Sequence, residues 1–368
     1  MIMANLLDYM KWRGDLSLEQ DPFNEIDSLL LARFSYFPFD TIIQPEETVT
    51  IEELSKRFET KDPNTMRILW EEDADLFPLM GHSKRFGQMK ASYFVNKVDP
   101  EQEKQFSAIT IFLPDNSIYI SYRGTDNTIV GWKEDFNMSF KSHVASQKEA
   151  VRYLETVAQK TEGRIRLGGH SKGGNLAVYA AVFSSPSVQD RIYHIFNNDG
   201  PGFDDDVIQT QAYQKMIQKV DTYIPQDSIF GRLLNHEERY TVVQSTQKGV
   251  MQHDVYTWQL LGKRFVRLKE VSNGSKFIDK SIKDWLKEID VEQREKIIDI
   301  VFEILNSTQA ETMGEIRSNL ISNATTILKS YKQVDVKDRK MIMATVKALL
   351  IVAKDNFMQE YELSRKNP

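Results

Sequence analysis

The fold of this chain is constrained most by one stretch of eight residues, GGHSKGGN at positions 168–175. A short apolar run precedes the stretch, and the apolar segment 176–182, which suits a helix, follows it. This order predicts a strand, a tight turn and a helix, with Gly169 and Gly173 leaving room on either side of Ser171. Such a turn exposes the serine hydroxyl. It also aims the first amides of the helix, which carry partial positive charge, at the same point.

A near-copy of the same pattern lies earlier in the chain. The letters GHSK recur at 81–84, but Arg85 stands where the second glycine is required, and no strand-like run precedes them. We therefore expect a loop at 81–84. At 169–173 we expect a nucleophile elbow, the turn that presents a catalytic serine. The alternative for 169–173 is a structural glycine-rich turn.

Composition excludes several functional classes. The 368 residues are 41% hydrophobic and 27% charged, as in soluble globular proteins, and the net charge of −6 does not favour nucleic-acid binding. The absence of cysteine excludes disulfides, thiolate metal sites and a cysteine nucleophile, and it suits a cytoplasmic protein. We expect no signal peptide, no transmembrane segment, no cofactor and no metal.

Strand-like and helix-like segments alternate through the middle of the chain. Two runs around the turn residues 114–116 predict an antiparallel hairpin, and four later strands are separated mainly by helical segments. This alternation predicts an α/β fold with a mostly parallel central sheet and helices on both faces. The expected strands lie at 106–113, 117–122, 164–169, 191–197, 219–224 and 240–245.

Both ends of the chain are predicted to be helical. Near the N-terminus, the apolar side chains within 29–39 are expected to pack in a core, and the alternative is a wall or lid of an acyl pocket. We divide the chain into a first domain, 1–271, with an N-terminal helical segment at 1–95 and a catalytic core at 96–271, and a helical C-terminal region at 272–368. The C-terminal region suits a bundle, a cap over the site or a dimer arm, which leaves a homo-oligomer open. Expected helices lie at 5–13, 23–37, 63–77, 276–288, 291–305, 310–331 and 336–362.

A serine nucleophile needs a histidine base and a carboxylate that orients the base. His253 fits because it follows the last expected strand after Ser171. The carboxylate is expected from Asp227, which follows the second strand after the elbow strand, and Asp199, at the end of the first, is the alternative. The remaining histidines precede the serine, adjoin it, or lie within or before later strands: His82, His143, His170, His194 and His236.

The oxyanion of an acyl-transfer transition state would need hydrogen-bond donors. We expect the backbone amide of Lys172 and a donor from the loop at Thr125 to fill this role. The ammonium group of Lys172 is expected to reach solvent or an anionic group of the substrate. His170 is expected to pack, with its side chain directed away from the serine hydroxyl.

Taken together, these residues resemble the class 3 lipase branch of the α/β-hydrolase superfamily. The residues RGT at 123–125 end a strand and are followed by Trp132 and Asp135, as in that branch. The elbow comes next, and Asp227 and His253 complete the order. The elbow together with DGPG at 199–202 is more closely similar to an intracellular group of bacterial lipase-like hydrolases.

The resemblance covers about 100–260 and implies an α/β-hydrolase fold, a triad of Ser171, Asp227 and His253, and an oxyanion donor at Thr125. It also implies an ion pair between Arg123 and Asp135. The expected activity is hydrolysis of an acyl ester or thioester, on a small-molecule or lipid-like substrate, through an acyl-enzyme. The alternatives are a peptidase or other acyl hydrolase on the same fold, and a binding module that no longer turns over.

Overall fold

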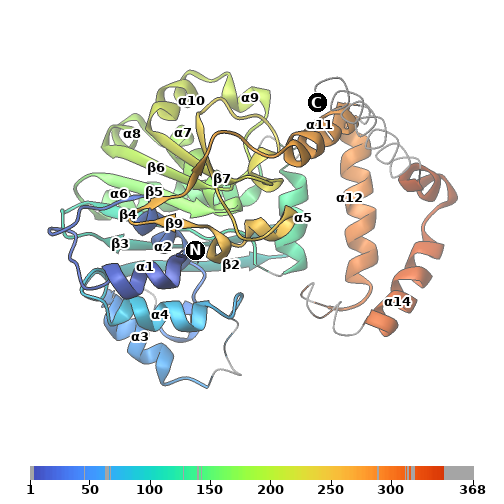
Figure 1. Ribbon diagram of the computed structural model, residues 1–368. Helices are drawn as coiled ribbons and strands as arrows, with labels where there is room; N and C mark the ends of the chain where they lie inside the picture. The colour runs from blue at the N-terminus through green and yellow to red at the C-terminus, as the bar shows by residue number, and fades with distance from the viewer. Residues whose placement is uncertain are drawn as a thin grey trace. The chain divides into compact units, whose positions relative to one another are not determined.

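The structure is a computed structural model, and its residues form two compact units (Figure 1). The first unit contains Met1–Gly124 and Ala145–Val271, and the second contains Thr125–Val144 and Ser272–Pro368. Residues 125–144, which were expected within the catalytic core, therefore belong to the second unit. The described residues are 4–44, 46–62, 66, 68–126, 128–138, 141, 143–287, 290–310, 312, 315 and 320–343.

The first unit is built on a nine-stranded sheet with the order β1-β2-β3-β4-β5-β6-β7-β8-β11. The pairings from β4 to β8 are parallel, whereas those from β1 to β4 and between β8 and β11 are antiparallel. The expected hairpin is confirmed as β3 and β4, but a mostly parallel sheet is correct only for the centre. The strands are β1 (Val49–Thr50), β2 (Lys90–Asp99), β3 (Lys104–Phe112), β4 (Ile118–Tyr122), β5 (Ile165–His170), β6 (Ile192–Asn198), β7 (Val220–Pro225), β8 (Tyr240–Val243) and β11 (Arg267–Leu268).

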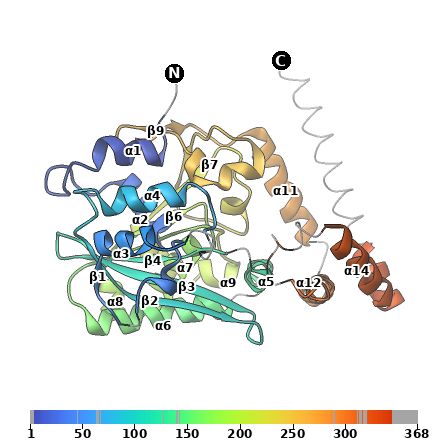
Figure 2. The ribbon, with the colours of Figure 1, turned by 90° about the horizontal axis from the view of Figure 1, so that it is seen from below.

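Helices cover both faces of this sheet, as Figure 2 shows. Along β4, Tyr119 packs under the N-terminal helices, whereas Ile118 and Ile120 pack on the opposite face with α6 and α7. This alternation follows from the two-residue period of a strand. One face carries α1 (Leu6–Arg13), α2 (Glu25–Phe34), α3 (Ile51–Glu59) and α4 (Asp73–Gly81). The other carries α6 (Ala145–Lys160), α7 (Lys172–Phe183), α8 (Pro186–Arg191), α9 (Asp205–Ile208) and α10 (Gln211–Met216).

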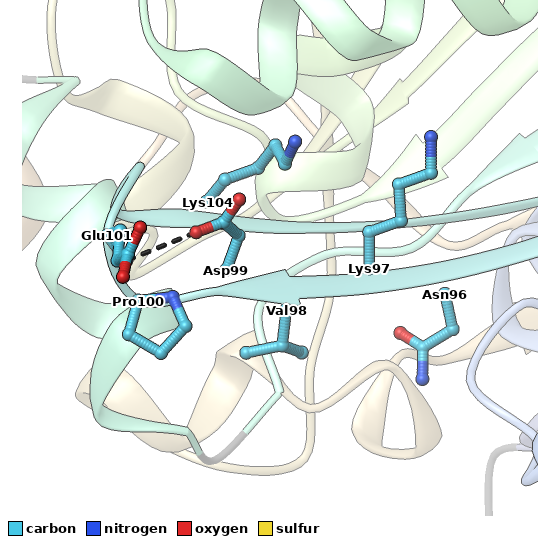
Figure 3. Close-up of a pocket in the computed structure, with 7 residues that line it drawn as sticks. All are labelled: Asn96, Lys97, Val98, Asp99, Pro100, Glu101 and Lys104. Carbon is cyan, nitrogen blue, oxygen red and sulfur yellow. Dashed lines mark hydrogen bonds between the residues drawn. The ribbon is translucent and has the colours of Figure 1, made fainter.

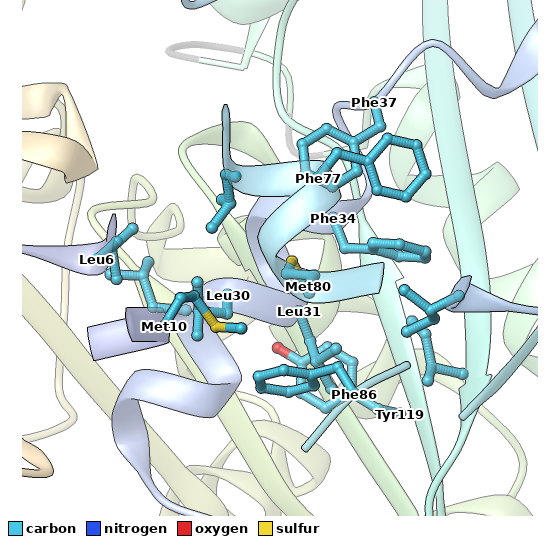
Figure 4. Packing of buried hydrophobic residues seen from close by; sticks show 14 of the residues in the cluster. Leu6, Met10, Leu30, Leu31, Phe34, Phe37, Phe77, Met80, Phe86 and Tyr119 are labelled. Atoms are coloured by element: carbon cyan, nitrogen blue, oxygen red, sulfur yellow. The ribbon is translucent and has the colours of Figure 1, made fainter. Parts of the chain in front are cut away.

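The aromatic side chains near the N-terminus form part of the core (Figure 4). Phe37 stacks on Phe77 of α4 with ring centroids 4.3 Å apart, and Phe34 contacts both rings edge-on. All three side chains are buried. The expectation that this cluster packs in a core is confirmed, because its rings face each other and the sheet.

The near-copy of the elbow pattern ends α4 and continues as a loop, as expected. Arg85, which replaces the glycine, donates from Nε and Nη2 to the two oxygens of Asp27 at 2.6 and 2.5 Å. Both side chains are fully buried. The residue that breaks the pattern is therefore one half of an ion pair inside the N-terminal core.

A second buried carboxylate, that of Glu238, lies just before β8. It accepts hydrogen bonds from His236 Nδ1 at 2.7 Å and from Tyr213 and Thr222, each at 3.0 Å. Burial raises the pKa of Glu238, but the hydrogen bond and charge of His236 together with the other donors lower it further, to about 2. Since this pKa lies below that of the unfolded chain, the ionised carboxylate stabilises the fold above about pH 4.5.

We expect this contribution to disappear as the pH falls from about 4.5 towards 2. The pKa difference corresponds to roughly 3 kcal/mol of unfolding free energy. Urea unfolding of wild type and Glu238→Gln should therefore differ most at pH 5 and above, and the difference should shrink at each lower pH. A difference that does not vary with pH would contradict this assignment.

The second unit contains helices only among its described elements of regular structure. α5 (Ile129–Asn137) packs on α12 (Val291–Asn306), where the rings of Phe136 and Phe302 lie 5.9 Å apart. Lys133 pairs with Asp299 at 2.8 Å across the same two helices. The other long helices are α11 (Asn273–Lys287) and α14 (Leu320–Gln333), and the helix expected at 336–362 lies largely outside the described residues. Across the described residues, no helix has the length and apolar character needed to cross a membrane.

Candidate active site

Ser171 lies in a strained turn between β5 and α7. Its backbone angles are φ 59° and ψ −136°, a region that residues with a side chain rarely adopt. Its amide donates to the carbonyl of Asn198 at 2.9 Å, and its own carbonyl accepts from the amide of Gly174 at 2.9 Å. The expected order of strand, tight turn and helix is therefore confirmed.

The spacing of the glycines follows from close backbone contacts around this turn. A Cβ atom at Gly169 would lie 2.3 Å from the carbonyl carbon of Gly173. A Cβ atom at Gly173 would lie 2.1 Å from the carbonyl oxygen of Tyr122, at the end of β4. Real Cβ atoms essentially never approach other atoms so closely. Only glycine fits at these two positions, so the pattern is a steric requirement of the turn.

His253 pairs with Asp199, which follows the strand next to the serine strand. The His253 Nδ1 to Asp199 Oδ2 distance is 2.6 Å. The Asp199 side chain is 1% exposed and that of His253 is 17% exposed. The second oxygen of Asp199 accepts from Ser228 Oγ at 2.5 Å and from the Gly231 amide at 3.2 Å. The carboxylate thus faces a histidine on one side and two fixed donors on the other.

Asp227 does not contact the ring of His253. Its Oδ2 accepts from Gln252 Nε2 at 2.8 Å and from the amide of Gly249 at 3.0 Å. The prediction that Asp227 is the carboxylate beside His253 is therefore wrong, and the alternative, Asp199, makes the contact. Both aspartates follow adjacent parallel strands and emerge at the same edge of the sheet. Their positions in the chain alone could not show which one the histidine loop meets.

His170, next to the serine, does more than pack. Its Nε2 lies 2.9 Å from the carbonyl oxygen of His253, and the two rings are 4.5 Å apart. Burial lowers the pKa of His170 well below its usual value, and the charges of His253 and Arg33 act in the same direction. A neutral ring with its proton on Nε2 donates to that carbonyl. His170 thereby ties the elbow to the backbone of His253.

Tyr36 is a contact of the elbow that the sequence did not predict. Its hydroxyl donates to the carbonyl of His170 at 3.1 Å and accepts from the amide of Gly124 at 3.1 Å. The hydroxyl lies 3.4 Å from His170 Nδ1. Tyr36 follows α2 in a segment rich in apolar residues. Its hydroxyl was the only feature of this residue that could have indicated a polar contact from the sequence.

The side chain of Lys172 is buried and does not reach solvent. Its ammonium group donates to the backbone oxygen and to Oε1 of Gln105 at 3.0 and 2.7 Å, and the residue is 1% exposed. The expectation that this ammonium group reaches solvent is therefore wrong. The cation is buried because Gln105, on β3, offers two oxygens to it, which compensates for the loss of water. The amide of Lys172 lies in the first turn of α7.

Thr125 belongs to the second unit, where its hydroxyl donates to Asp135 Oδ2 at 2.5 Å. The single proton of that hydroxyl is thus used by Asp135, and the amide of Thr125 remains as the expected donor. Arg123, in the first unit, donates to Asn96 at 2.9 Å. The ion pair between Arg123 and Asp135 stays a prediction.

Within the described residues, no hydrogen bond joins the hydroxyl of Ser171 to His253. In the absence of substrate such bonds are often long and tighten only in the reacting complex. The same described residues contain no group of three or more histidine and carboxylate side chains placed to hold a metal ion.

A shallow hollow at the turn between β2 and β3 is separate from these residues (Figure 3). Its wall mixes Lys97 and Lys104 with Asp99 and Glu101, and Glu149 pairs with Lys97 at 2.5 Å. With charges of both signs, and a lysine already paired, the hollow does not select for one class of ligand.

Comparisons with known proteins identify a family and distant structural relatives. A protein-family model described as Mbeg1-like matches residues 80–303. No curated protein matches the chain. Among solved structures, M37 lipase is 15% identical over 56% of this chain and 69% of its own, with a TM-score of 0.36. Rhizomucor miehei lipase in its propeptide complex is 13% identical over 68% and 74%, with a TM-score of 0.37.

Proposed function

The chain belongs to the Mbeg1-like family, whose model matches more than half of it, and we propose that it is a serine hydrolase of acyl esters or thioesters. One observation carries the proposal. A serine in a strained turn and a buried aspartate bound to a histidine at 2.6 Å follow neighbouring parallel strands. These are the three groups that nucleophilic acyl transfer requires, and they lie at one edge of the sheet.

In the proposed mechanism His253 accepts the proton of Ser171 as the hydroxyl attacks the acyl carbon. Asp199 holds the ring of His253 in the tautomer that has its proton on Nδ1 and stabilises the imidazolium that forms. The leaving alcohol or thiol takes the proton from His253, and an acyl-enzyme remains. Water then attacks the acyl group while His253 accepts a proton from it. His253 returns that proton to Ser171 Oγ as the bond between Oγ and the acyl carbon breaks, which releases the acid and restores the free serine.

The developing oxyanion would be stabilised by the amide of Lys172, and Thr125 stays the second donor that the sequence resemblance implies. Support for Lys172 is its place in the first turn of α7, where the helix dipole favours negative charge. We propose a small-molecule or lipid-like acyl substrate because of the sequence resemblance to class 3 lipases. A cytoplasmic location is part of the proposal, for which the absence of cysteine is the support.

A fluorophosphonate probe, which reacts with activated serines, tests the proposal directly. We expect wild type to be labelled and Ser171→Ala not to be. The matched control is Ser83→Ala, which removes the serine of the near-copy at 81–84 and should leave labelling unchanged. Folded wild type that does not react, or a Ser171→Ala variant that still does, would contradict the proposal. Failure of folded wild type to react would favour a binding module that does not turn over.

A further inference from the structure

We propose that Asp227 is a positioning residue, which acts through Gln252 to fix the loop that carries His253 at its distance from Asp199. The inference rests on the proposed function, since His253 and Asp199 are its base and its carboxylate. We call the contact between Asp227 and Gln252 the Asp227–Gln252 clamp. Neither residue touches the substrate in this scheme, so neither is a catalytic residue.

The clamp consists of reciprocal hydrogen bonds. The amide of Asp227 donates to Gln252 Oε1 at 2.7 Å, and Gln252 Nε2 donates to Asp227 Oδ2 at 2.8 Å. The same carboxylate oxygen accepts from the amide of Gly249 at 3.0 Å. Gln252 is fully buried, and its carbonyl accepts from Trp258 Nε1 at 2.8 Å. The residue immediately before His253 is therefore held at its side chain and at its backbone.

The turn after β7 holds both members of the histidine–aspartate pair. Asp227 binds the histidine loop, while the next residue, Ser228, donates to Asp199 Oδ1 at 2.5 Å. One short segment thus contacts the loop of the base and the carboxylate that orients it. A shift of this segment would change the 2.6 Å contact between His253 and Asp199. Misplacement of a reacting group by about 1 Å can lower a rate by roughly 10²-fold.

The geometry separates the effect of the charge of Asp227 from the effect of its shape. Asp227 Oδ2 accepts both hydrogen bonds made to this carboxylate, one from Gln252 Nε2 and one from the amide of Gly249. In Asp227→Asn the amide oxygen can occupy that position and keep both bonds, although the charge is lost. In Asp227→Glu the charge remains, but the longer side chain displaces Gln252. A positioning role therefore predicts that Asn is tolerated better than Glu.

The experiment measures kcat, KM and fluorophosphonate labelling rates for Asp227→Asn, Asp227→Glu and Asp227→Ala in the full chain. We expect Asp227→Asn to remain close to wild type. Asp227→Ala should lower kcat by roughly 10²-fold, with little change in KM, because only the base is displaced. Asp221→Ala is the matched control, since it removes a carboxylate that pairs with His194 at the opposite end of β7. It should retain wild-type activity.

The inference and the proposed function can be overturned separately, because each is contradicted by a different result. Wild type that resists labelling would refute both. Labelling of wild type and of Asp227→Ala at equal rates would refute the clamp alone, as would an Asp227→Asn variant less active than Asp227→Glu. Circular dichroism and thermal unfolding establish that each variant is folded. If Asp227→Ala does not fold, the activities of Asp227→Asn and Asp227→Glu decide whether Asp227 acts by positioning.

Discussion

Replacing Ser171 with alanine is expected to abolish acyl turnover while the fold stays intact. Alanine has no hydroxyl to attack the acyl carbon, and the removal of such a nucleophile lowers kcat by about 10⁶-fold in a well-studied serine protease. The measurement is hydrolysis of p-nitrophenyl esters of increasing acyl chain length, with circular dichroism as the check on folding. Turnover by Ser171→Ala at the wild-type rate would exclude Ser171 as the nucleophile.

Residue 171 also affects stability, because its backbone conformation is strained. At φ 59° and ψ −136°, a side chain at residue 171 costs roughly 1–3 kcal/mol in backbone strain, which glycine does not incur. Glycine loses more backbone entropy on folding, about 0.5–1 kcal/mol, so part of this gain is offset. We expect Ser171→Gly to be inactive and more stable than Ser171→Ala in urea unfolding. The reverse order would show that the turn is not strained.

Replacing Asp199 with asparagine is expected to lower kcat by about 10⁴-fold, as the equivalent change does in a serine protease. Asp199 Oδ1 accepts from Ser228 and from the amide of Gly231, so the oxygen of asparagine would take that side. Its NH₂ group would then face His253 Nδ1. Nδ1 would have to accept a hydrogen bond, which places the ring proton on Nε2. Nε2 is the nitrogen that must lack a proton in order to accept the proton of Ser171.

The measurement is kcat/KM for Asp199→Asn beside Asp227→Asn, which neutralises the carboxylate that the sequence favoured. Fluorophosphonate labelling of Asp199→Asn should slow in parallel with turnover, because both depend on proton removal from Ser171. Equal losses in the two variants would mean that the contact between His253 and Asp199 does not decide the tautomer. A loss in Asp227→Asn alone would return the role to Asp227.

The elbow was predictable because each of its features is local. Gly169, Ser171 and Gly173 are fixed by contacts within the turn and with the end of β4, and the strand and helix on either side have their own hydrophobic patterns. The carboxylate was not predictable in this way. Asp199 and Asp227 are both turn aspartates after adjacent strands, and the choice between them depends on Ser228 and Gly231 folding back over Asp199.

Two other differences have similar physical causes. The strand β2 is not among the expected strands, and its pairing with β3 shifts between Ser92 and Val95. Tyr93, at φ 57°, interrupts the two-residue alternation there. The ammonium group of Lys172 was expected to reach solvent or an anionic group of the substrate, but it is buried against Gln105. Its partner, Gln105, lies far away in the sequence, and no local pattern indicates the contact.

The buried pair of Arg85 and Asp27 also limits how this chain can evolve. One substitution, Arg85→Gly, would complete a second copy of the elbow pattern at 81–85. It would also leave the carboxylate of Asp27 without its cation inside the core, and loss of one partner of a buried pair costs about 3–5 kcal/mol. A second copy of the sequence pattern is thus one substitution away, but it would lack the strand that leads into an elbow. The substitution would also forfeit a large share of the free energy that keeps the protein folded.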